Sequence, residues 1–166
     1  IVESNPDQVQ LLEEAFTEME ELRFAKPGFP VCDREYALDW REAVELLRGR
    51  PAFDAVLFNI SADAPSALSA FQTIRAAAPS AAILLVAAAA DEPLALGMVR
   101  QGAQDYLLES EVDCAPLARA LRCGIERSRL NYARESMSLL DDLTGLFNRQ
   151  GMAVMAERDE RIAAGL

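Results

Sequence analysis

The residues best placed to do chemistry in this chain stand directly after apolar segments. Four such positions follow segments that read as strands: Glu3, Asn59, Ala87 and Glu109. Ligand sites in parallel sheets collect at the carboxyl ends of the strands, so we expect these four residues to lie close together. A carboxylate here could hold a cation, but Asn59 is a neutral amide without the anionic oxygen that forms an acyl phosphate. The central position therefore lacks a nucleophile.

The elements that would position these residues alternate between helices and strands. Apolar residues at steps of three and four predict helices near residues 6–19, 40–49, 68–74 and 91–101. Short apolar runs predict strands at residues 1–2, 29–33, 55–58, 83–86 and 106–108. A long helix is predicted from Val112. Alternating β and α units predict an α/β fold, a doubly wound five-stranded parallel sheet with helices on both faces.

Composition is typical of a globular protein and disfavours nucleic acid and membranes as partners. The 166 residues are 51% hydrophobic and 26% charged, which suits a domain with a sizeable core. The net charge of −11 disfavours binding to nucleic acid and to anionic membranes. The longest apolar run, residues 81–90, is shorter than the roughly 20 residues that cross a bilayer. No signal peptide is visible, so we expect a cytoplasmic protein.

Motifs for metal binding and redox chemistry are sparse. The chain has no histidine, which excludes histidine-based catalysis and the usual zinc sites. Its three cysteines, Cys32, Cys114 and Cys123, form no CxxC pair, and their odd number argues against a disulfide framework. A reducing compartment fits this pattern.

The most specific sequence motif is a stretch of six residues preceded by Leu96 and Arg100 on a predicted helix. It reads Gly102-Ala103-Gln104-Asp105-Tyr106-Leu107. Together with the acidic turn after the first strand and the order of the strands, it makes residues 1–127 resemble a CheY-like receiver domain of response regulators. In that family two acids after the first strand help to hold Mg²⁺, and an aspartate after the third accepts phosphate. A Thr or Ser follows the fourth strand and a Lys the fifth.

The chain departs from that pattern at nearly every working position. Glu3 matches the first acid, Ser4 stands in place of the second, and Asn59 occupies the phosphoacceptor position. Ala87 replaces the hydroxyl residue and Glu109 the lysine. The loss of two carboxylates leaves a poor Mg²⁺ site, and Glu109 puts negative charge where a cation would neutralise phosphate. We therefore expect a pseudo-receiver with no catalytic residue, no cofactor and weak or lost Mg²⁺ binding.

Simpler and alternative interpretations stay open at these positions. Ser4 could be a helix cap and Glu3 a solvated acid. Tyr106 matches the aromatic switch residue of receivers, and with Ala87 beside it we expect one fixed, inward rotamer. Asp63, in the loop after the central strand, is the alternative acceptor for a phospho-accepting receiver that works through a non-standard site.

Two further alternatives concern ligands. A residual cation site could use Glu3, Glu109 and the Asn59 amide oxygen. A nucleotide- or flavin-binding domain of similar topology would need a glycine- or hydroxyl-rich phosphate loop after the first strand. Residues 3–7 of this chain contain neither glycine nor a basic side chain, which argues against such a domain.

The segment Asp141-Asp142-Leu143-Thr144-Gly145-Leu146-Phe147-Asn148-Arg149 closely resembles the opening DxLTGLxNR signature of GGDEF domains, the diguanylate cyclases. The signature positions are Asp141, Leu143, Thr144, Gly145, Leu146, Asn148 and Arg149. Residues 141–166 would be the incomplete start of such a domain, with its first helix from Met152. The family's catalytic loop and metal-binding acid lie further on, so we expect no enzyme activity from this polypeptide. The resemblance implies a diguanylate cyclase as the parent protein.

A connecting helix would join the two parts, with residues 128–140 continuing the fifth helix. Seven positions repeat at alternating steps of three and four, the spacing of a coiled coil: Ala118, Leu121, Ile125, Ser128, Tyr132, Glu135 and Leu139. Ser128 and Glu135 are polar and weaken the seam in its second half. The functional interpretation is a signalling helix that pairs two chains into a homodimer through Leu121, Ile125, Tyr132 and Leu139. The alternative is a helix packed on its own sheet as far as Ile125. Input would come from an unidentified protein or ligand.

Overall fold

The computed structural model of this protein describes residues 1–22, 31–49, 53–60, 66–137, 144–149, 151–152 and 155. The chain forms two compact units, Ile1–Ser128 and Arg129–Leu166, and each is described by itself. Among the described residues, no helix combines the length and the apolar character needed to cross a bilayer.

A parallel sheet lies at the centre of the first unit. Its strands are β1 (Ala55–Asn59), β2 (Ala82–Ala87) and β3 (Asp105–Leu108), in that order across the sheet. Every residue of β2 is buried, as expected for a central strand covered on both faces. The register places Asn59 beside Val86, and Ala87 beside Leu108, so the carboxyl ends of the strands meet at one edge.

The predicted doubly wound α/β fold is confirmed, but its first two strands are reduced to single bridges. Val2 forms parallel bridges with Phe58 and with Ala37, which extends the order to Ala37, Val2, β1, β2 and β3. The Ala37 N–H donates to the Ile1 carbonyl at 2.8 Å, and the Ala37 carbonyl accepts the Glu3 N–H at 3.0 Å. The described part of the chain therefore contains three full strands, not five.

The prediction of a strand at residues 29–33 was wrong in position. Val31, Cys32 and Asp33 belong to no strand, and Phe29 and Pro30 lie outside the described residues. The pairing occurs at Ala37 instead, which is 3% exposed, whereas Val31 is 73% exposed. The prediction relied on the apolar run, but the segment pairs at Ala37, the residue that is buried in the core.

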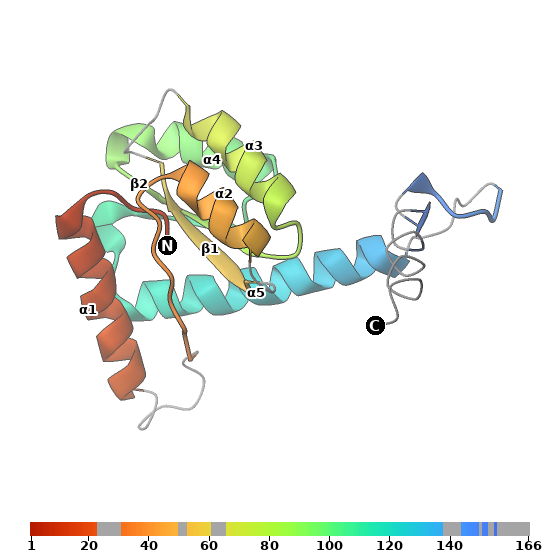
Figure 1. The fold of residues 1–166 in the computed structure, drawn as a ribbon. Coiled ribbons are helices and arrows are strands. Elements are labelled where there is room, and N and C mark those ends of the chain that lie inside the picture. The colour runs from red at the N-terminus through yellow and green to blue at the C-terminus, as the bar shows by residue number, and fades with distance from the viewer. Residues whose placement is uncertain are drawn as a thin grey trace. The chain divides into compact units, whose positions relative to one another are not determined.

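Helices cover both faces of the sheet (Figure 1). Helices α1 (Pro6–Leu22) and α5 (Cys114–Met137) cover one face. Helices α2 (Trp40–Gly49), α3 (Ala67–Ala77) and α4 (Glu92–Arg100) cover the other. Because side chains alternate along a strand, Leu84 and Val86 face the first layer while Ile83 and Leu85 face the second.

Short polar and flexible residues end the helices where the sequence predicts. The Asn5 side-chain oxygen accepts the Asp7 N–H at 3.0 Å and so caps α1, which begins at Pro6. Gly102, just after α4, has a φ of 110°, a conformation that favours glycine. This turn leads the chain from α4 into β3, the strand that Glu109 follows.

Gly124 allows α5 to lie close to the sheet. A Cβ added at this position would lie 2.9 Å from Cδ2 of Leu84, which is fully buried in β2. Gly97, inside α4, has no atom within 4 Å of the same hypothetical Cβ. The two helical glycines therefore differ in packing, although both lower helix propensity.

We predict opposite effects on stability for alanine at the two positions. Gly97→Ala should stabilise the protein by about 0.5–1 kcal/mol, the usual gain from removing glycine inside a helix. Gly124→Ala should destabilise it by roughly 1–2 kcal/mol, because the overpacking against Leu84 exceeds that gain. Urea unfolding of both variants measures the difference. An equal stabilisation by the two substitutions would show that α5 does not depend on close approach to β2.

Candidate functional site

The carboxyl edge of the sheet brings together three of the four residues singled out above, through one side chain. The Asn59 Nδ2 donates to Oε2 of Glu3 and to Oε1 of Glu109, the latter at 3.2 Å. Glu3 follows the bridge residue Val2, Asn59 ends β1, and Glu109 follows β3. The fourth residue, Ala87, ends the intervening strand β2. The prediction that strand ends converge here is confirmed.

The Glu3 carboxylate is buried and held by two donors. Glu3 is 3% exposed and Asn59 is 6% exposed. One carboxylate oxygen accepts the Asn59 amide, and the other accepts the Asn5 N–H at 2.7 Å. The interpretation of Glu3 as a solvated acid was therefore wrong, because a carboxylate this deep in a protein requires hydrogen-bond donors.

The Asn59 amide holds two carboxylates together without adding charge. Two carboxylates that share a site repel each other, and the Nδ2 group supplies a hydrogen to each of them. An aspartate in the same position would add a third negative charge. At a separation of about 4 Å and an effective dielectric of about 20, each such repulsion approaches 4 kcal/mol. The amide at residue 59 is thus the stable choice beside Glu3 and Glu109.

The amide nitrogen also occupies the side of Asn59 that a cation would need. Both carboxylates face Nδ2, not the amide oxygen that the residual cation site required. Within the described ranges, no three acidic or cysteine side chains are grouped so as to hold a metal ion. Weak or lost Mg²⁺ binding stays a prediction, now with a geometric reason.

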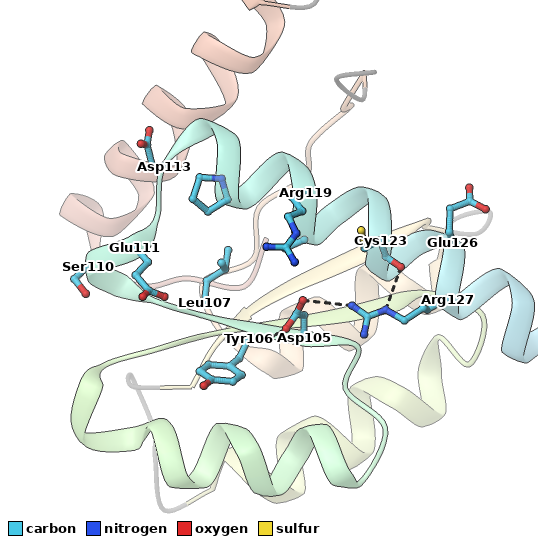
Figure 2. Close-up of a pocket in the computed structure, with 12 residues that line it drawn as sticks. Asp105, Tyr106, Leu107, Ser110, Glu111, Asp113, Arg119, Cys123, Glu126 and Arg127 are labelled. Carbon is cyan, nitrogen blue, oxygen red and sulfur yellow. Dashed lines mark hydrogen bonds and ion pairs between the residues drawn. The ribbon is translucent and has the colours of Figure 1, made fainter. Parts of the chain in front are cut away.

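The two switch positions lie on the side of the sheet that faces α4. Ala87 is fully buried and has no hydroxyl to offer. Tyr106 is half-buried against the α2, α3 and α4 layer, and its hydroxyl donates to Oε1 of Glu92 at 2.6 Å. Figure 2 shows its ring on the side of β3 away from α5. A single fixed rotamer of Tyr106 remains a prediction.

Sequence reasoning missed Glu92 as the partner of Tyr106. The run Asp91-Glu92-Pro93 indicated only the start of a helix, and α4 does begin at Glu92. The carboxylate of Glu92 raises the pKa of Tyr106 by accepting its hydroxyl hydrogen and by repelling the phenolate. The sequence feature that could have indicated this contact is the acidic Glu92 in the first turn of α4, within reach of Tyr106 on β3.

The outcome differs for Ser4 and Asp63, the two other positions predicted for the site. Ser4 is exposed, and the cap of α1 is Asn5, so Ser4 does not play the capping role suggested for it. Asp63, the alternative phosphoacceptor, lies outside the described residues.

The first half of the predicted pairing seam is used inside the chain's own domain. Leu121 is 6% exposed and packs with α1 and the sheet, and Ile125 is half-buried beside it. Ser128 is 4% exposed, and its hydroxyl donates to the Ser80 carbonyl at 2.9 Å. Leu121 is therefore occupied largely within its own domain, whereas Ile125 keeps part of its surface exposed. The same spacing serves a coiled coil and a helix lying on a sheet.

Beyond Ser128, α5 exposes the seam residue Tyr132 and also Leu130, which lies outside the seam. Tyr132 is 44% exposed, and its neighbour Leu130 is 64% exposed. Leu139, the last predicted pairing residue, lies outside the described residues. Exposed apolar side chains thus begin directly after Ser128.

The open edge of β3 borders a cleft of about 930 Å³ beneath α5 (Figure 2). The Arg127 guanidinium spans this edge, 3.3 Å from Asp105 and 3.3 Å from the Cys123 carbonyl oxygen. The other Asp105 oxygen accepts the Tyr106 N–H at 3.0 Å. The Asp105 side chain thereby occupies a backbone donor that an added strand would need, which protects the edge from strand addition.

In the second unit, the described signature residues form a turn that leads into a helix. Gly145 has a φ of 66°, and Thr144 Oγ1 accepts the Leu146 N–H at 3.5 Å. The Asn148 side chain accepts the Gly151 N–H at 2.8 Å, the geometry of a helix cap. Arg149 is exposed at the start of that helix. Asp141 and Leu143 lie outside the described residues.

Comparisons with known proteins support the fold. No protein-family model matches the chain, and no curated protein does. An adenylate cyclase structure from Rhodopirellula baltica has 15% identity and a TM-score of 0.64, covering 82% of this chain and 92% of that one. NtrX from Brucella abortus has 17% identity and a TM-score of 0.65, covering 98% of this chain and 33% of that one. The first unit has the fold of response-regulator receiver domains.

We predict that Asn59→Asp destabilises the protein at neutral pH by roughly 1–3 kcal/mol, because it replaces a shared donor with a third carboxylate. Repulsion raises the pKa of the new aspartate in the folded state, so the deficit is present above that pKa. It should shrink as the pH falls toward the usual aspartate value of about 4. Denaturant unfolding across this pH range measures the effect.

The matched control is Asn131→Asp, which adds the same charge at an exposed position of α5. It should leave stability nearly unchanged at every pH. A neutral-pH stability of Asn59→Asp equal to that of the control would contradict the arrangement of Glu3, Asn59 and Glu109 described above.

We also predict that the hydrogen bond from Tyr106 is visible in a tyrosine titration. Ultraviolet absorbance should show, for Tyr106, a phenol with a pKa above the usual value of about 10. Glu92→Gln should bring that pKa down, and Tyr106→Phe should remove the transition. The neutral phenol favours the folded state, so its contribution to stability is present below pH 10 or so and is lost at higher pH. No change in titration with Glu92→Gln would refute the contact.

Proposed function

We propose that the chain is a regulatory pseudo-receiver module that cannot accept phosphate at Asn59. The observation that supports this most directly is the Asn59 amide nitrogen bonded to both Glu3 and Glu109. Phosphoryl transfer requires an anionic nucleophile and cations that neutralise the phosphoryl oxygens. This site offers a neutral amide between two carboxylates instead. The fold is kept while the chemistry is replaced by a hydrogen-bonded bridge.

The module would act through contacts between proteins. Beyond Ser128, α5 continues to Met137 and exposes Leu130 and Tyr132. Tyr132 is a position of the predicted seam, and exposed apolar side chains in a seam of this spacing are the usual means of helix pairing. We assign homodimer formation to this part of α5 and its continuation through residue 140, since Leu121 is occupied within the domain.

The output would be a diguanylate cyclase domain, and the setting cyclic di-GMP signalling in the cytoplasm. Support comes from the resemblance of residues 141–149 to the GGDEF opening and from the helix cap at Asn148. Pairing by the α5 extension would set the distance between two such domains. Input would come from a protein or a small molecule in place of phosphate.

We predict that Tyr132→Asp weakens dimerisation by about tenfold or more, because a charge buried in the interface opposes association. Light scattering over a range of protein concentrations measures the molar mass. The matched control is Leu96→Asp, an exposed leucine on α4 that is 41% accessible and lies outside the seam. It should leave the dimer intact.

Removal of all residues after Ser128 should likewise leave a monomer. A wild-type chain that is monomeric at every concentration would refute pairing through α5. Equal weakening by Leu96→Asp would move the interface to the α4 face.

A further inference from the structure

A cavity of about 200 Å³ lies beside the carboxylate bridge, between the end of β1 and the first turns of α2 and α3. Its apolar walls come from Val2, Phe58, Trp40 and Ala70. Glu3 and Asn59 border it on the side of the bridge. Figure 1 shows α2 and α3 next to each other on this face of the sheet. The cavity is distinct from the larger cleft under α5, which shares none of these residues.

The acidic groups that border the cavity already have hydrogen-bond donors. One Asp39 oxygen accepts the N–H groups of Arg41 at 2.8 Å and Glu42 at 2.9 Å. These donors, that of Glu42 first, hold the pKa of Asp39 below its ordinary value. Glu3 accepts from Asn59 and Asn5, as described above. A cationic ligand would therefore find carboxylates whose charge is already engaged.

The cavity is also bordered by hydrogen-bond donors that are available to a ligand. The Trp40 indole N–H is buried and has no acceptor among the described residues. The Arg41 guanidinium is exposed and lies 4.5 Å from the centre of the Trp40 ring, and its charge also contributes to the lowered pKa of Asp39. Buried donors in proteins are almost always satisfied, so an unpaired one at a cavity wall indicates a missing acceptor. Trp40 and Arg41 are adjacent residues that both line the cavity, so one buried unpaired N–H and one exposed cation lie close together.

We propose that this cavity binds a small organic carboxylate with an apolar body about the size of benzoate. The carboxylate would accept from the Arg41 guanidinium and the Trp40 N–H, the charge-assisted geometry that arginine favours. The apolar part would lie against Trp40, Phe58 and Ala70. Mixed cavities of this kind, apolar with a few convergent polar groups, are typical of small-molecule sites.

Such a ligand would touch the same bridge that replaces the phosphorylation site. Its contacts with the walls formed by Glu3 and Asn59 would couple occupancy to the ends of the first segment and β1. The binding proposal does not depend on the proposed function, because a ligand can occupy the cavity whatever the oligomeric state. It would add a chemical class for the input that the module receives.

The chain's only tryptophan lines the cavity, so binding can be observed directly. Trp40 fluorescence of the full chain would be followed during titration with benzoate, benzamide and benzylamine, which have one shape and differ in charge. Benzoate should give a saturable change, with a dissociation constant of about a millimolar, and should raise the melting temperature. Benzylamine should give neither effect. Equal responses to benzoate and benzylamine, or no saturation with benzoate, would overturn the proposal.

Two variants separate a built site from nonspecific quenching. Arg41→Gln should weaken benzoate binding by about tenfold, the effect of losing one charge-assisted hydrogen bond. The control Arg48→Gln removes the same charge from the other end of α2 and should bind as the wild type does. Ala70→Leu should fill the cavity and abolish binding. Because Ala70 is fully buried and its variant could fail to fold, the exposed Arg41 decides the outcome. Unchanged affinity in Arg41→Gln would refute the assignment.

Discussion

The Asn59 amide nitrogen, shared between Glu3 and Glu109, is the interaction on which the rest of this site depends. It joins the ends of three separate chain segments at the carboxyl edge of the sheet. Glu3 is almost fully buried, and a carboxylate in that position needs donors from the protein itself. The fold therefore keeps a polar centre, but the centre is closed by internal hydrogen bonds that leave no acceptor for phosphate. A neutral amide is the group that satisfies two acids at once.

The hydrogen-bonded bridge with its neighbouring cavity and the long helix α5 lie at different positions in the fold. The bridge and the neighbouring cavity lie at the strand ends, while α5 lies across the opposite face with Gly124 against Leu84. Ser128 joins α5 to the turn before β2, through the Ser80 carbonyl. Exposed apolar residues begin two positions later with Leu130. Input at the strand ends and output along α5 would then be linked through one packed core.

Much of this arrangement could be predicted from the sequence, and the exceptions have physical causes. Apolar periodicity located all five helices and β1, β2 and β3, because each buries a regular stripe. It misplaced the second segment, since Ala37 is too small and isolated to stand out as a strand. The convergence of Glu3, Asn59 and Glu109 followed from topology, but the donor role of the amide did not. Heptad spacing alone could not tell whether Leu121 faces a second helix or its own sheet, because both need the same stripe.

The most direct test of the account is the intact mass of the full chain after incubation with acetyl phosphate and Mg²⁺. The closed amide bridge predicts no phosphorylated species at any concentration of the phosphodonor, because the acceptor position is a neutral amide and both neighbouring carboxylates accept its hydrogens. Tandem mass spectrometry would locate any phosphoryl group that did appear. A stoichiometric acyl phosphate on any aspartate of the first unit would contradict the pseudo-receiver assignment and favour a working receiver with a non-standard acceptor.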